Sequence, residues 1–177
     1  MQFLELKQKL NNFIVFNLND IRKIDDNFDR RRLNEWINKK YIKKLRRSYY
    51  IFSDLEINES VLFSIANKIY SPSYVSLETA LSYYNLIPEC VYTITSVSTR
   101  KTKNIKNNLG NFSYRKIKPS LMFGYEIIKK NNCNFKIAEL EKSILDYFYL
   151  NTQIKDEKDR RELVFILASN GIRVWIE

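Results

Sequence analysis

The sequence predicts an α+β protein with two parts, because segments with helical and with strand-like patterns alternate along its 177 residues. In some segments apolar residues recur every three or four positions. In other, shorter segments β-branched and aromatic residues are concentrated. Hydrophobic residues make up 45% of the chain, which is enough for a core without support from metals or disulfides. We therefore expect two small units, the first mainly helical and the second mixed.

The beginning of the chain predicts two short helices. Phe3, Leu6 and Leu10 are spaced as on one face of a helix. A second helix fits residues 18–24, and Asn17 just before it is a residue type that often caps a helix N-terminus. The polar residues that follow this segment suit a turn.

A third helix and a β-hairpin are predicted next. The helix fits residues 28–40, and its apolar face consists of Leu33, Trp36 and Ile37. Residues 41–45 and 49–52 are typical of strands, and the charged residues 46–48 suit the turn between them. Three helices followed by a hairpin are the element order of a winged helix-turn-helix, so we expect that fold in residues 1–53.

The second part, residues 54–177, is predicted to mix helices and strands. The boundary lies in the polar stretch 53–58, where the basic segment ends. Because this connection is short, we expect the two parts to touch. The expected helices are residues 61–70, 76–84 and 138–150, and the expected strands are residues 91–97, 112–117 and 121–126. The apolar face expected for the last helix consists of Leu140, Ile144, Leu145 and Phe148.

Positive charge is unevenly distributed along the chain. Lys and Arg number 30 against 20 Asp and Glu, which gives a net charge of +10. Residues 1–53 hold 13 basic and 6 acidic side chains, a net charge of +7, whereas residues 54–177 hold 17 and 14, a net charge of +3. Such an excess favours polyanionic partners, so we expect the first part to bind double-stranded DNA.

One face of the third helix has the side chains that read DNA bases. With Leu33 at the centre of the buried face, Arg31, Asn34 and Asn38 point away from the core. Arg and Asn pair with guanine and adenine edges in the major groove, while basic residues beside them and in the hairpin contact phosphates. The candidate DNA-binding residues are Arg30, Arg31, Arg32, Asn34, Asn38, Lys43, Lys44, Arg46 and Arg47.

Other interpretations of these residues stay open. The basic triplet could be an ordinary solvated helix face, in which Arg31 pairs with Glu35 one turn later. Acidic residues in the second part could form a metal-dependent nuclease site, since divalent ions prefer carboxylate oxygen, but their spacing favours a solvated surface. These acids are Glu126, Glu139, Glu141 and Asp146. Two pairs of tyrosines could stack on bases, but core and sheet packing suits them better. These are Tyr49, Tyr50, Tyr83 and Tyr84.

Several classes of chemistry lack their usual residues. The sequence has no His, which excludes Ser-His-Asp and Cys-His sites and most zinc sites. Its three Gly residues form no phosphate-binding loop, and Cys90 and Cys133 alone make no disulfide framework. No apolar run reaches the roughly 20 residues that cross a bilayer. We therefore expect a cytoplasmic protein that is not an enzyme and uses no cofactor or metal.

Six segments occur in an order that resembles one known family. They are ANKIYSPSYVSLETALSYY (66–84), LIPE (86–89), TSVSTRKT (95–102), GNFSYRKI (110–117), FGYE (123–126) and AELEKSILD (138–146). This pattern resembles the AbiEi antitoxins of type IV toxin-antitoxin systems, over about residues 10–150. The end of the chain, residues 164–177, departs from the family, which looks to continue into further helices.

The resemblance implies two activities. The family's N-terminal winged helix represses its own operon by binding promoter DNA, with inverted repeats as the expected target. Its C-terminal domain counteracts a nucleotidyltransferase-like toxin, directly or indirectly. A stand-alone transcriptional regulator without antitoxin activity is the alternative, and an enzyme acting on nucleic acid is a third class. A toxin gene next to this one would favour the antitoxin.

Overall fold

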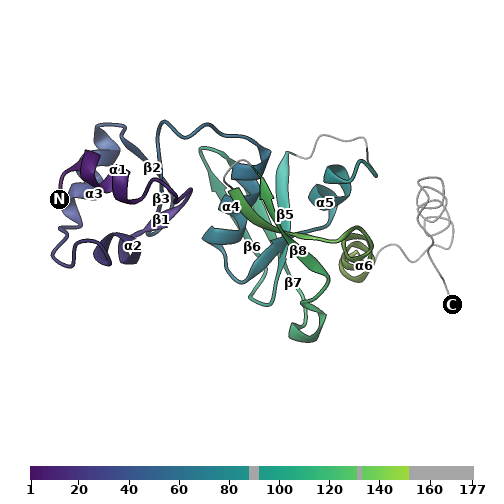
Figure 1. The fold of residues 1–177 in the computed structure, drawn as a ribbon. Coiled ribbons are helices and arrows are strands. Elements are labelled where there is room, and N and C mark those ends of the chain that lie inside the picture. Colours follow the sequence, from purple (N-terminus) through teal and green to yellow (C-terminus); the bar gives the residue numbers. More distant parts are fainter. Residues whose placement is uncertain (88–91, 131–132, 152–177) are drawn as a thin grey trace, which may run out of the picture.

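The computed structural model describes residues 1–87, 92–130 and 133–151. The fold is α+β, as predicted, and Figure 1 shows its two parts. The first part contains α1 to α3 and a small three-stranded sheet. The second is built on a six-stranded sheet. Residues 53–58 connect β3 to α4 without helix or strand.

Local signals account for most elements of the first part. The side-chain oxygen of Asn17 accepts hydrogen bonds from the backbone N–H groups of Asn19 (2.7 Å) and Asp20 (3.1 Å). Asp20 in turn accepts from the Asn17 N–H, which completes a capping box at the start of the second helix. The elements are α1 (Phe3–Lys9), β1 (Phe16–Asn17), α2 (Leu18–Arg22), α3 (Arg31–Asn38), β2 (Ile42–Arg46) and β3 (Tyr49–Phe52). The sequence interpretation missed β1 and began α3 three residues too early.

The small sheet is covered on both faces. Its strand order is β1-β3-β2, so β3 is central and alternates between the two sides. Tyr50 and Phe52 pack with the helices of the first part, around Leu6 and Trp36. Ile51 packs instead with residues of the second part. The two parts therefore touch, as expected, through the back of this sheet.

Within the described residues of the second part, three helices pack around its sheet. The strand order is β6-β7-β5-β4-β9-β8, in which β4 runs parallel to β9 and β5 parallel to β7. The helices are α4 (Glu59–Ile69), α5 (Glu78–Tyr83) and α6 (Leu140–Leu150). The strands are β4 (Ser73–Val75), β5 (Thr93–Ser98), β6 (Lys103–Asn107), β7 (Gly110–Lys116), β8 (Tyr125–Lys130) and β9 (Cys133–Ala138).

Helices cover the sheet from both sides. Phe112 and Tyr114 of β7 point toward α4, whose Ile65 and Ala66 they contact in one core. Tyr74 and Val97, on the opposite side, pack with Tyr147 of α6. α5 follows the short β4 and contacts both β5 and α6. The sheet is thus the middle layer of the second part.

Part of the strand prediction was wrong. Residues 121–126 were expected to form one strand, but Pro119–Leu121 form a 3-10 turn and β8 begins only at Tyr125. β4, β6 and β9 were not expected as strands. β6 lies in a polar stretch that resembles a loop, because as an edge strand it buries only Ile105.

The predicted apolar face of α6 was also partly wrong. Ile144 is buried as expected, but Leu145 is 58% exposed. Asp146, expected at the solvated surface, is instead 2% exposed, and Lys142 is 4% exposed. They form a buried ion pair one helical turn apart. α6 is therefore rotated relative to the face that its apolar residues predict.

The remaining expectations concern the two cysteines, the end of the chain and membrane-spanning segments. Cys90 and the departing end of the chain, residues 164–177, lie outside the described residues. Cys133 is buried, and burial raises the pKa of its thiol. Among the described residues, none of the helices has the length and apolar character to cross a membrane.

Candidate nucleic-acid interface

Hydrogen bonds from backbone N–H groups define both ends of α3. At its start, the Asp29 side-chain oxygen accepts a hydrogen bond from the Arg31 N–H at 2.9 Å. At its end, Lys40 adopts a left-handed conformation with φ 57°. The Tyr41 N–H then donates to the Trp36 carbonyl at 2.9 Å, which is the bond pattern of a Schellman motif. This sharp ending leads the chain directly into β2.

Aromatic packing fixes the rotation of α3 about its axis. Leu33 and Trp36 are 1% and 4% exposed, as predicted. The Trp36 ring lies 5.6 Å from Phe3 and 5.5 Å from Phe28, measured between ring centroids. Because these contacts hold the apolar side inward, the opposite side of the helix faces solvent. That side carries Arg31, Asn34 and Asn38, all exposed.

The two arginines beside this face differ in their surroundings. Arg30 is exposed. Arg32 is half-buried, donates a hydrogen bond to the Met1 carbonyl, and lies 6.0 Å from the centroid of the Trp36 ring. Arg32 therefore packs against the body of the first part, whereas Arg30 and Arg31 extend from it.

The pairing of Arg31 with Glu35 does not occur. Glu35 accepts a hydrogen bond from Lys39 at 2.6 Å instead. This hydrogen bond, with the charge of Lys39, holds the pKa of the exposed Glu35 carboxyl below its usual value. The acidic residue of α3 is thus neutralised locally, and the Arg31 side chain is left to solvent.

The hairpin places its basic residues on different sides. Lys43 lies opposite Ile51 and Lys44 opposite Tyr50, so the two exposed lysines point to opposite faces of the sheet. The pairing shifts register between Lys44 and Arg46. Arg47 at the turn is exposed.

Arg46 lies in the contact between the two parts. Its Nη1 donates to the carbonyl of Ile69, the last residue of α4, at 2.7 Å. Its guanidinium lies 5.5 Å from the Tyr70 ring centroid, and the guanidinium of Arg100 lies 4.9 Å from the same centroid. Asn107 of β6 also donates to the Leu45 carbonyl at 3.3 Å. The hairpin is therefore docked on the second part, and Arg46 differs from the exposed turn residue that was expected.

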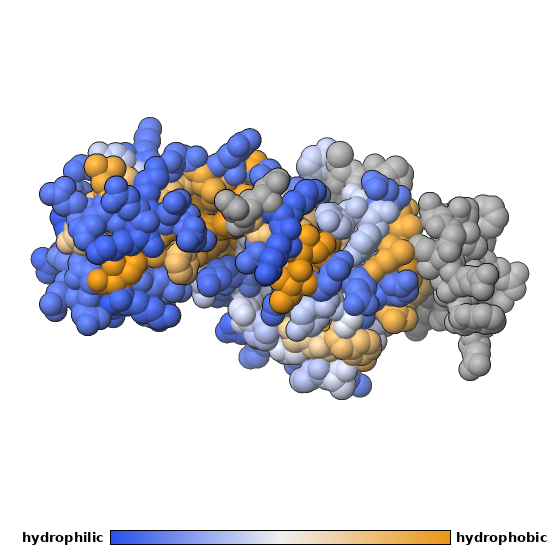
Figure 2. Space-filling model, viewed as in Figure 1, coloured by the Kyte–Doolittle hydropathy of each residue, from blue (hydrophilic) through white to orange (hydrophobic). Residues whose placement is uncertain are grey.

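The remaining candidates lie in the first part. In Figure 1, α3 lies at the end of the molecule opposite the second part, with the small sheet between them. Hydrophilic residues dominate the visible face of the first part in Figure 2. The structure thus places Arg31, Asn34 and Asn38 on one solvent-exposed surface, the side of α3 opposite its buried residues. It separates Arg32 and Arg46 from that surface.

Sequence reasoning missed the junction around Tyr70. Arg46, Tyr70 and Arg100 are far apart in the chain, and a basic turn looks the same whether it is free or docked. Tyr70 itself donates to the Lys101 carbonyl at 2.6 Å and contacts Tyr114. No pattern within a single segment indicates these partners.

Neither a carboxylate metal site nor base stacking by the paired tyrosines is supported by the geometry. Asp146 is buried beside Lys142, while Glu126, Glu139 and Glu141 are exposed. No group of three or more acidic or Cys residues is placed to hold a metal ion within residues 1–87, 92–130 and 133–151. The paired tyrosines pack against protein, Tyr50 against Phe16 at 6.1 Å and Tyr83 against Tyr84 at 5.3 Å.

Comparison with known proteins adds no family assignment. No family model matches the chain, and no curated protein matches it significantly.

Proposed function

We propose that this protein binds duplex DNA through the exposed side of α3. The observation that carries the proposal is the pairing of a buried Leu33–Trp36 side with an opposite side of Arg31, Asn34 and Asn38. Arg and Asn make bidentate hydrogen bonds to guanine and adenine, and an α-helix fits the major groove. The three helices and the hairpin support a winged helix-turn-helix in this role.

Phosphate contacts come from residues around the reading helix. Arg30, Arg47 and Lys44 are exposed and carry positive charge. Lys43 is also exposed but points to the side of the small sheet that faces the second part. Such residues position a protein on DNA and release counterions, so affinity falls with salt at a slope of roughly 0.9 per neutralised phosphate. Arg32 and Arg46 contribute through packing, because both are held by backbone carbonyls.

We further propose that the protein is an antitoxin that represses its own operon. This part rests on the resemblance of its second part to AbiEi antitoxins. It implies a promoter, expected to contain inverted repeats, and a nucleotidyltransferase-like toxin as partners. A cytoplasmic location and the absence of enzyme activity belong to the same proposal.

The second candidate is a transcriptional regulator without antitoxin activity. It is favoured by the fact that every exposed candidate DNA contact lies within the first 47 residues. DNA binding would then need nothing from the second part except a stable support. Co-expression with the neighbouring toxin, scored by cell growth, separates the two candidates.

Gel-shift titrations on the operon's promoter and on random duplex test the DNA-binding proposal. Arg31→Ala or Asn34→Ala should weaken promoter binding by about 1 to 3 kcal/mol, the value of a bidentate base contact. Random duplex should bind nearly as before. Arg47→Ala should weaken both duplexes to a similar extent, because it removes a phosphate contact. Asn12→Ala, an exposed asparagine outside α3, is the matched control. Equal losses on both duplexes for Arg31→Ala would remove this residue from base reading.

A further inference from the structure

One face of the large sheet is covered over only part of its width. α6 packs over Tyr74 and Val97, but the strands β5, β7 and β6 continue beyond it to the sheet edge. On α6's side of these strands the side chains alternate with the buried Phe112 and Tyr114. The side chains on α6's side of β5, β7 and β6 are polar in the part of the sheet that α6 does not cover.

Register places these polar side chains in two rows. Lys106, Asn111 and Thr93 lie side by side across three strands, and Asn104, Ser113 and Thr95 form the next row. Adjacent strands are about 4.8 Å apart, so each row is roughly 10 Å wide. Within this surface are a hollow of about 380 Å³ and a second of about 440 Å³. Both are lined by Thr93 and Ser113, so they adjoin.

The ends of this surface carry an arginine and a tyrosine. Arg115 follows Ser113 along β7 on the same side, and its Nη2 donates to the carbonyl of Leu150 at the end of α6 at 3.0 Å. Tyr92 lines the second hollow and is 90% exposed, which is unusual for so large a ring. Glu78, half-buried at the start of α5, is the acidic residue on this rim.

The surrounding sequence is strongly basic. Residues 90–125 include no Asp or Glu. The same stretch holds seven basic residues, namely Arg100, Lys101, Lys103, Lys106, Arg115, Lys116 and Lys118. Of the basic residues on the strands of this stretch, Lys106 and Arg115 lie on the open face, whereas Lys103 and Lys116 share the side of Tyr114 and α4. An anionic polymer is the occupant that this charge attracts.

We propose that this open face of β6, β7 and β5 binds a single strand of nucleic acid. Lys106 and Arg115 contact phosphates, and Tyr92 stacks on a base. Hydrogen bonds with bases and sugars come from Asn104, Asn111, Ser113 and Thr93. Thr95 lines the face but is not among them, because its hydroxyl already donates to the Ser76 carbonyl at 2.7 Å. A single strand can bring its base edges and faces to such a surface. A rigid duplex would reach it only with phosphates, and two cations among hydroxyl and amide groups match that poorly.

Fluorescence anisotropy with labelled 12-nucleotide RNA and DNA strands of mixed sequence tests the proposal on the full chain. Lys106→Glu should weaken single-strand binding at least tenfold. Lys129→Glu, the same charge change on β8 at the opposite sheet edge, should change it less than twofold. Circular dichroism and thermal melting establish that both variants are folded. Comparing the two strands distinguishes RNA from DNA as the natural ligand.

Tyr92 provides a second, independent variant. Tyr92→Ala should weaken single-strand binding about three- to tenfold, whereas Tyr92→Phe, which keeps the ring, should bind as the natural protein does. Equal losses for Lys106→Glu and Lys129→Glu would reduce the effect to net charge and overturn the proposal. Absence of saturable single-strand binding would overturn it as well.

Promoter duplex in the same assay separates this inference from the proposed function. Lys106→Glu should leave duplex binding within threefold, because α3 lies in the other part of the molecule. A parallel loss of duplex and single-strand binding would make the face an extension of the duplex interface and contradict the inference. Failure of the natural protein to bind the promoter would contradict the proposed function and leave single-strand binding intact.

Discussion

The helices α3 and α6 show how differently two amphipathic segments can be oriented. α3 buries Leu33 and Trp36 and exposes its polar residues, as its sequence pattern predicts. α6 buries Lys142 and Asp146 but leaves Leu145 58% exposed. Apolar periodicity therefore determines the orientation of the first helix but not of the second.

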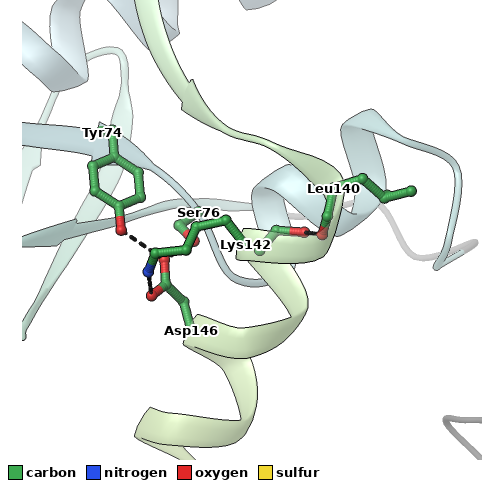
Figure 3. A network of polar contacts seen from close by, with 6 residues as sticks. Tyr74, Ser76, Leu140, Lys142 and Asp146 are labelled. Carbon is green, nitrogen blue, oxygen red and sulfur yellow. Dashed lines mark hydrogen bonds and ion pairs between the residues drawn. The ribbon is translucent and has the colours of Figure 1, made fainter. Parts of the chain in front are cut away.

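Polar partners in and just after β4 explain the orientation of α6. Figure 3 shows Lys142, Tyr74 and Ser76 converging on the Asp146 carboxylate. Tyr74 OH donates to it at 2.9 Å and Ser76 Oγ at 2.8 Å, while Lys142 bonds its other oxygen. Four hydrogen-bonding groups are satisfied together inside the protein, and this offsets the cost of burying two charges. The buried side of α3 packs in a core of aromatic and aliphatic residues instead.

Removing the carboxylate from α6 should have the largest effect on stability. Asp146→Ala leaves Lys142 buried without a counter-charge, so we expect a loss of about 3 to 5 kcal/mol in unfolding free energy. Urea unfolding followed by circular dichroism measures it. Glu141→Ala, which removes an exposed carboxylate from the same helix, should cost less than about 0.5 kcal/mol. Similar values for the two variants would mean that the ion pair does not hold α6.

On α3, removing the aromatic ring of Trp36 should cause the largest loss of stability. Trp36→Ala removes contacts with Phe3 and Phe28, and we expect destabilisation on the order of 3 kcal/mol. Thermal unfolding checks this value, with Asn34→Ala as the exposed control on the same helix. An unchanged melting temperature together with lost DNA binding would show that Trp36 is a contact residue and that the assigned helix face is wrong.

Alkaline pH should weaken the buried phenols that hold the sheet to its helices. Burial raises the pKa of Tyr74 and Tyr114 above the usual value of 10, with the Asp146 charge adding to the shift of Tyr74. Their stabilisation is complete below pH 10 and is lost as pH rises, because the unfolded chain ionises first. Each phenol should cost about 1.4 kcal/mol per pH unit above 10. Urea unfolding at pH 9 and 11 measures the slope, and a flat profile would contradict it.

The smallest effect is expected for the leucine that sequence pattern places in the core. Leu145→Ala should change stability by less than about 0.5 kcal/mol, because the side chain is exposed. Its neighbour provides the contrast, since Ile144→Ala at a buried site should cost about 2 to 5 kcal/mol. Urea unfolding of both variants compares the two positions directly. A large loss for Leu145→Ala would restore the sequence-based orientation of α6.

Signals confined to one segment predicted much of the fold. Asn17, the predicted cap, precedes α2 and caps it through its side chain. Asn58, which was not predicted as a cap, does the same for α4. β9 was missed although its pattern is clear, since Cys133, Phe135 and Ile137 alternate with more exposed residues. β4 has three residues, all buried, and thus offers no alternation to detect. Short strands depend on their neighbours for pairing, which no local pattern records.

In the candidate site, too, some features follow from a single segment and others depend on residues far apart in the chain. The sequence alone determined which side of α3 is exposed, because Leu33 and Trp36 must be removed from water wherever the helix packs. Only the tertiary structure decided that Arg46 docks on Ile69, 23 residues away, and that Asp146 meets Tyr74, 72 residues away. Hydrophobic burial follows from side-chain type and spacing. Whether a charged side chain is buried depends instead on its hydrogen-bond partners, and only folding brings those partners close to it.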